Sequence, residues 1–183
     1  MTEIGFHFVG YLVQEPYLKN WPQREGLQVA TIERDVHPDL QREWKEIGGF
    51  LNATEFRTTL PRVPEAGWVL NGYSIEPDAI ETVLWYKTDK PEKTFLYALH
   101  TQRANDELLV IGYELVDCAI ERLSILNNCG YSLDEIHRVA GELNRYGLFD
   151  SSGQAKEFQK YVASRNYTHN CSAVFEVLGR PLS

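Results

Sequence analysis

Apolar and polar residues alternate along several short stretches of this chain, the pattern of half-buried β-strands. Gly10 indicates a bend in the first stretch, and an Asn71-Gly72 pair predicts a tight turn after the third. The continuous apolar run after Glu107 predicts a central strand covered on both faces. The predicted strands are Ile4–Val13, Leu27–Ile32, Gly67–Leu70, Thr94–His100, Leu108–Val116 and Ser172–Leu178.

Apolar residues spaced three and four apart predict about four helices between these strands. The first begins at Pro38 and the second at Pro77, since proline is favoured in the first turn. Ser132 and Glu135 have capping-box spacing, which predicts a third helix running to Tyr146. A fourth begins at a cap provided by Ser151 or Ser152, whereas residues 50–66 are predicted to form an irregular loop.

Signals for β-hairpins outnumber regular alternation of strand and helix along the chain. We therefore expect an α+β fold with a mixed or mostly antiparallel sheet, on which about four helices pack. A chain of 183 residues is most simply one domain, so the prediction is a single domain over residues 1–183.

The composition indicates a folded protein that stays out of membranes. Hydrophobic residues make up 43% of the chain, but no apolar run approaches the roughly 20 residues of a membrane span. The N-terminal MTEIGFHFVG lacks the basic residues of a signal peptide. Three cysteines, at positions 118, 129 and 171, indicate ordinary thiols in a reducing compartment, so a cytoplasmic location is expected.

The formal net charge is −8, and the whole surplus lies in the first two-thirds of the chain. Residues 1–60 carry nine acids and six bases, residues 61–120 carry ten and five, and residues 121–183 carry seven of each. Such a field repels phosphate backbones and therefore argues against nucleic-acid binding. It attracts a cationic protein partner, although solubility alone also accounts for an acidic surface.

Cys129 is the best-placed candidate nucleophile, because it precedes Gly130 and the start of a predicted helix. His137 or His169 could act as its base, and Asp117 or Asn128 could orient that base. Nothing in the sequence fixes their distances, and a buried cysteine acting as a small hydrophobe explains Cys129 equally simply.

Acidic residues near the end of one predicted strand, Glu114, Asp117 and Glu121, could form a pair of catalytic carboxylates. Alternation with its neighbours predicts instead that Glu114 points outward from a half-exposed face. No cofactor or metal is expected, because phosphate-loop and zinc-protease motifs are missing. The His169 and Cys171 pair is too short to join Cys118 and Cys129 in a typical zinc site.

The chain is thus small, acidic and rich in Tyr and Trp, with four tryptophans at positions 21, 44, 68 and 85. In this overall character it resembles the broad class of immunity proteins that neutralise bacterial toxins. The resemblance implies a protein-binding protein without catalysis, whose acidic face covers the cleft of a cationic toxin domain. The residues expected to bind the partner are Asp39, Glu43, Glu46, Asp78, Glu81 and Trp21.

Two other functions stay open from the sequence. One is an unrecognised hydrolase or transferase with a site around Asp117, Cys129 and His137. The other is a structural or regulatory subunit that pairs through an exposed edge strand, so the chain is expected to be a monomer or a homodimer.

Overall fold

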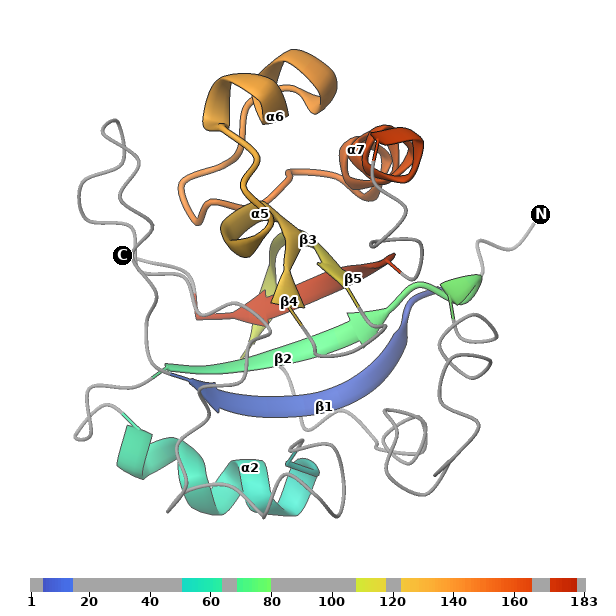
Figure 1. Ribbon diagram of the computed structural model, residues 1–183. Helices are drawn as coiled ribbons and strands as arrows, with labels where there is room; N and C mark the ends of the chain where they lie inside the picture. The colour runs from blue at the N-terminus through green and yellow to red at the C-terminus, as the bar shows by residue number, and fades with distance from the viewer. Residues whose placement is uncertain are drawn as a thin grey trace.

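The computed structural model describes residues 5–14, 51–63, 69–79, 108–117, 123–165 and 172–180 (Figure 1). Its strands are β1 (His7–Gln14), β2 (Val69–Ile75), β3 (Leu109–Asp117), β4 (Leu123–Ser124) and β5 (Ser172–Gly179). Its helices are α2 (Ala53–Thr59), α5 (Ile125–Asn128), α6 (Leu133–Ala140) and α7 (Ser152–Arg165), with a short 3₁₀ helix at Leu60–Arg62.

The five strands form one sheet in the order β1-β2-β5-β3-β4, and all four pairings are antiparallel. The predicted α+β fold with an antiparallel sheet is therefore confirmed. The last strand in the sequence, β5, lies in the middle, between β2 and β3. In Figure 1, α2 lies beside β1, and α5, α6 and α7 gather near β3 and β5.

The predicted bend in the first strand is confirmed. The register between β1 and β2 shifts between Phe8 and Gly10, where a bulge interrupts the ladder. Gly10 has a φ of 150°, a conformation that residues with a Cβ rarely adopt, so glycine is the residue that fits there.

The predicted turn at Asn71-Gly72 is wrong, because both residues lie inside β2. Gly72 pairs with Tyr11 on one side and with Leu178 on the other. A Cβ at Gly72 would lie 3.2 Å from side-chain atoms of both neighbours. The glycine is therefore needed for close packing across three strands rather than for a turn.

The irregular loop predicted for residues 50–66 is also wrong, since α2 and the 3₁₀ helix occupy most of it. The Asn52 side chain accepts hydrogen bonds from the backbone N–H groups of Thr54 and Glu55, and the Glu55 carboxylate accepts one from Asn52 N. This capping box starts the helix. Just before it, Leu51 exchanges two backbone hydrogen bonds with Tyr11 at the outer side of β1.

The strand predicted after Glu107 exists as β3 and lies inside the sheet, between β5 and β4, but it is not covered along its whole length. Leu109 is 54% exposed and Val110 is 46% exposed, while the later residues of the strand are buried. The apolar run thus does not reflect continuous burial, since the exposed Leu109 and Val110 follow the buried Leu108. Beyond β3, the sheet edge is continued by β4 and by a two-way backbone bridge between Tyr113 and Phe149.

Both serine caps are confirmed, although one helix is shorter than predicted. Ser132 Oγ accepts from Glu135 N, and Ser151 Oγ accepts from Gln154 N at the start of α7. The third predicted helix ends at Ala140 instead of Tyr146, because Gly141 adopts a φ of 88° that breaks the helical path.

The core divides into three groups of packed side chains. Phe158, Val162 and Ala155 of α7 are fully buried against β3, β5 and α6. Phe56 of α2 packs with Tyr11 of β1 at a ring-centroid distance of 4.2 Å. The third group fills the space around Phe175 and Tyr73.

Three predicted elements lie outside the described residues: the strands Leu27–Ile32 and Thr94–His100 and the helix that begins at Pro38. The second predicted helix is described only as far as Ala79. Among the described residues, no helix has the length and apolar character required to cross a membrane.

Candidate functional site

A buried carboxylate, that of Glu76, lies at the end of β2. Glu76 follows Ile75 directly and is only 4% exposed. Its backbone N–H donates to Val174 O at 3.0 Å, and its side-chain Oε1 accepts from Val174 N at 2.9 Å. The carboxylate therefore takes the place of a backbone carbonyl in the antiparallel pair between β2 and β5.

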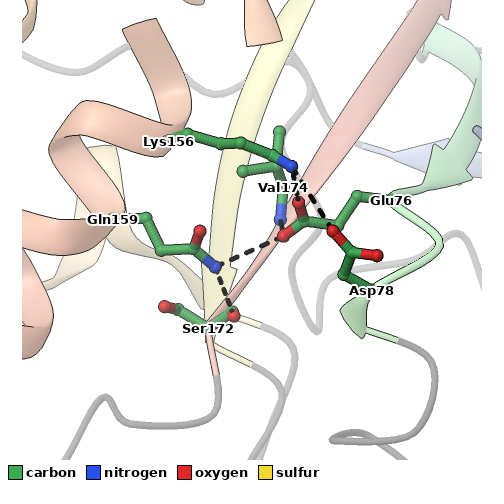
Figure 2. A network of polar contacts seen from close by, with 6 residues as sticks. All are labelled: Glu76, Asp78, Lys156, Gln159, Ser172 and Val174. Atoms are coloured by element: carbon green, nitrogen blue, oxygen red, sulfur yellow. Dashed lines mark hydrogen bonds and ion pairs between the residues drawn. The ribbon is translucent and has the colours of Figure 1, made fainter. Parts of the chain in front are cut away.

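The same carboxylate ties the sheet to α7 (Figure 2). Lys156 Nζ lies 3.1 Å from Glu76 Oε2, and Gln159 Nε2 donates to Glu76 Oε1 at 3.3 Å. Gln159 Nε2 also donates to Ser172 O at 2.7 Å. Because both carboxylate oxygens have partners, the buried charge is compensated, as such a charge requires.

Asp78 lies at the surface above this network. Ala79 N donates to Glu76 O at 3.2 Å, which closes a turn with Pro77 and Asp78 at its two central positions. The Asp78 side chain is 83% exposed, and its Oδ2 lies 3.9 Å from Lys156 Nζ. Figure 2 shows the Lys156 ammonium facing both acids, with a dashed line to each. We call Glu76, Asp78, Lys156 and Gln159 the Glu76 cluster.

Asp78 is one of the six residues predicted to bind a partner. The structure places it on an exposed turn, as a recognition residue would need to be. The other predicted partner-binding residues lie outside the described ranges; these are Asp39, Glu43, Glu46, Glu81 and Trp21.

The predicted outward orientation of Glu114 is wrong, because this residue is fully buried. It lies opposite Phe175 in the β3–β5 register, whereas Tyr113 on the other face is only half-buried. Both faces of β3 are covered at this point, so alternation alone could not identify the exposed face. A buried carboxylate in such surroundings depends on compensating contacts.

The three residues of the alternative enzyme site lie in different parts of the fold. His137 Nε2 accepts a hydrogen bond from Leu143 N at 3.4 Å, beyond the C-terminal end of α6. Cys129 precedes the N-terminal end of that helix, and its half-buried side chain packs against the core group that includes Leu133 and Ile136. Asp117 is buried at the end of β3 between Leu123 and Ser172. Asn128 ends α5, and His169, Cys118, Glu121 and Cys171 lie outside the described residues.

Metal ligands do not gather in the described part of the chain: no three His, Cys, Asp or Glu side chains there are placed to hold an ion. Besides the Glu76 cluster, the described residues contain a second group of interacting polar side chains, at the junction of α6 and α7.

This second group is built from two tyrosines. Tyr161 OH donates to Glu135 Oε1, and the Arg165 guanidinium lies 5.1 Å from the Tyr161 ring centroid. Tyr131 packs edge-on against Phe158 with ring centroids 5.3 Å apart. The hydrogen bond to Glu135 raises the pKa of Tyr161, and burial raises the pKa of Tyr131.

These shifts predict loss of stability in alkali. Both phenols hold their protons more tightly in the folded chain, so their contribution is present below about pH 10 and is lost as the pH rises through the folded pKa values. Glu135→Gln should lower the pKa of Tyr161, because a charged acceptor is replaced by a neutral one. Titration of ring-labelled tyrosine by NMR measures this, with the exposed Asp134→Asn as control. A Tyr161 signal that titrates at the same pH in Glu135→Gln and the parent would contradict the assignment.

Comparisons with protein-family models, with curated proteins and with solved structures gave no match. The function is therefore argued from the residues of this chain alone.

Proposed function

We propose that this protein acts by binding another protein, without catalysis, and that it is an immunity protein that covers the cleft of a cationic bacterial toxin domain. The observation that carries the proposal is the position of Asp78. Its carboxylate is 83% exposed on a turn whose first residue, Glu76, is fixed in the sheet. By contrast, the Glu76 carboxylate and the His137 imidazole are engaged in internal contacts.

The overall charge supports the same proposal. A net charge of −8 concentrated in the first 120 residues favours encounter with a basic surface and disfavours nucleic acid. An exposed acid held on a rigid turn loses little conformational freedom on binding, which improves affinity. The proposed site of action is the cytoplasm, where the thiol of Cys129 would stay reduced.

The proposal predicts that Asp78→Lys weakens a specific complex. The first candidate partner is the product of the neighbouring gene, which should encode a toxin domain and bind one-to-one. Charge reversal at a contact acid should weaken binding roughly 10-fold to 100-fold, and added salt should slow association. Surface plasmon resonance at two ionic strengths measures both effects.

Glu157→Lys is the matched control, because Glu157 is an exposed acid on α7 that pairs with Lys160. It changes the net charge equally but lies outside the proposed contact. Equal loss from the two variants would show that only overall charge matters. No binding of the parent protein to the neighbouring gene product would reject this partner, and an unrelated neighbouring gene would count against the immunity function.

A further inference from the structure

The Glu76 cluster contains more than an exposed acid. We propose that Glu76, Lys156 and Gln159 are positioning residues, which hold Asp78 so that it receives a guanidinium group of the partner. This inference rests on the proposed protein-binding function and adds to it the chemistry that the Asp78 turn recognises.

The backbone of the Asp78 turn is anchored at both ends. Glu76 is held on β5 by two hydrogen bonds to Val174, one from its backbone and one to its side chain. Ala79, at the other end, is 6% exposed and packs in the core beside Ile75. Both ends of the turn are thus anchored, and Asp78 between them has little freedom to move as a backbone unit.

Lys156 is shared unequally between the two carboxylates. Lys156 Nζ lies closer to the buried Glu76 carboxylate, at 3.1 Å, than to Asp78, at 3.9 Å. A lysine so placed compensates mainly the acid that cannot reach water. The distance to Asp78 exceeds that of a hydrogen bond, so the exposed carboxylate keeps its capacity to accept donors from outside.

The open carboxylate of Asp78 suits a guanidinium better than an ammonium. A carboxylate with most of its surface open accepts two parallel N–H groups from an arginine, whereas a lysine ammonium offers only a compact point charge. The ammonium of Lys156 already lies on one side of Asp78. Lys156 repels any second cation, but a guanidinium on the open side offsets this by donating two N–H groups to the carboxylate, and it is more weakly hydrated than an ammonium.

The positioning role can be tested without a partner protein, by measuring the backbone mobility of the Asp78 turn. In the parent protein, the ¹⁵N order parameters of Asp78 and Ala79 should be about 0.85, as in a strand. Glu76→Gln places an amide N–H₂ against Lys156 and should lower the Asp78 value below about 0.6, while the sheet stays folded. Lys156→Gln, at a half-exposed site, should act in the same direction. Glu157→Gln is the control on the same helix. Unchanged order parameters in both Glu76→Gln and Lys156→Gln would overturn the positioning role.

Ligand chemistry is tested with two defined probes, the capped peptides acetyl-Gly-Arg-Gly-amide and acetyl-Gly-Lys-Gly-amide. The arginine peptide should shift the Asp78 side-chain carboxyl ¹³C signal saturably, with an affinity about threefold to tenfold higher than the lysine peptide. Asp78→Asn should abolish this preference. Equal affinities for the two peptides, or no shift of Asp78, would overturn the guanidinium assignment.

A double substitution separates positioning from a general effect on the fold. If Glu76 acts through Asp78, Glu76→Gln weakens binding of the arginine peptide by about threefold to tenfold in the parent and has no further effect in Asp78→Asn. Equal losses in both backgrounds would overturn the inference. Failure of the neighbouring gene product to bind would instead reject the proposed partner, and these peptide measurements would be unaffected by that outcome.

Discussion

Gly112→Ala is expected to lower the free energy of unfolding by about 2–5 kcal/mol, from backbone strain combined with overpacking. Gly112 lies at the bulge of β3 with a φ of 151°. A Cβ there would lie 2.6 Å from Leu148 Cβ and 2.9 Å from the backbone oxygen of Phe149. The backbone of Phe149 cannot move away easily, because it exchanges two hydrogen bonds with Tyr113.

Urea unfolding monitored by circular dichroism measures this loss, and two other glycines provide controls. Gly130 has a φ of 77° but nothing within 4 Å of its would-be Cβ, so Gly130→Ala isolates the backbone strain. Gly5 has neither a positive φ nor a close neighbour, so Gly5→Ala should change stability little. A Gly112→Ala variant no less stable than Gly130→Ala would show that the bulge can open at no cost.

Glu76→Ala is expected to destabilise the protein by about 1–3 kcal/mol, the cost of leaving a buried backbone donor without its acceptor. The substitution leaves Val174 N without its acceptor inside the sheet and removes the buried counter-charge of Lys156. An exposed ion pair provides the contrast, because Glu157→Ala removes a partner of Lys160 at the surface and should cost no more than about 1 kcal/mol.

Thermal and urea unfolding of the two variants should be compared under the same conditions. Glu76→Gln should be less destabilised than Glu76→Ala, because the amide oxygen can still accept from Val174 N. Similar small losses for Glu76→Ala and Glu157→Ala would mean that the buried network contributes little to stability and that water replaces it readily.

Local sequence signals predicted the elements whose chemistry is local. Alternation identified β1 and β5, and serine caps identified the starts of α6 and α7. The helix α2 was missed because its capping box uses Asn52 in place of serine or threonine, and Pro61 and Pro64 nearby suggested a loop. The turn at Asn71-Gly72 was predicted wrongly because an Asn-Gly pair looks the same in the sequence whether the glycine forms a turn or packs closely against a strand that is distant in the sequence.

The candidate site could be predicted only in part. Asp78 was recognised as an exposed acid near the start of a predicted helix. Glu76 was not recognised, although it stands directly between an apolar residue and a proline. Its main partner, Val174, is 98 residues away, and such a distance along the chain leaves no mark in any local pattern.

The central place of the last strand has a consequence for synthesis on the ribosome. Both β2 and β3 form one of their two ladders with β5, which is translated only after residue 171. Until β5 is translated, these two strands lack their shared neighbour. Ladder hydrogen bonds between segments so far apart in the sequence also form slowly. A nascent chain stalled before this point therefore lacks the strand that joins its two halves, and it is the form in which chaperones would be most needed.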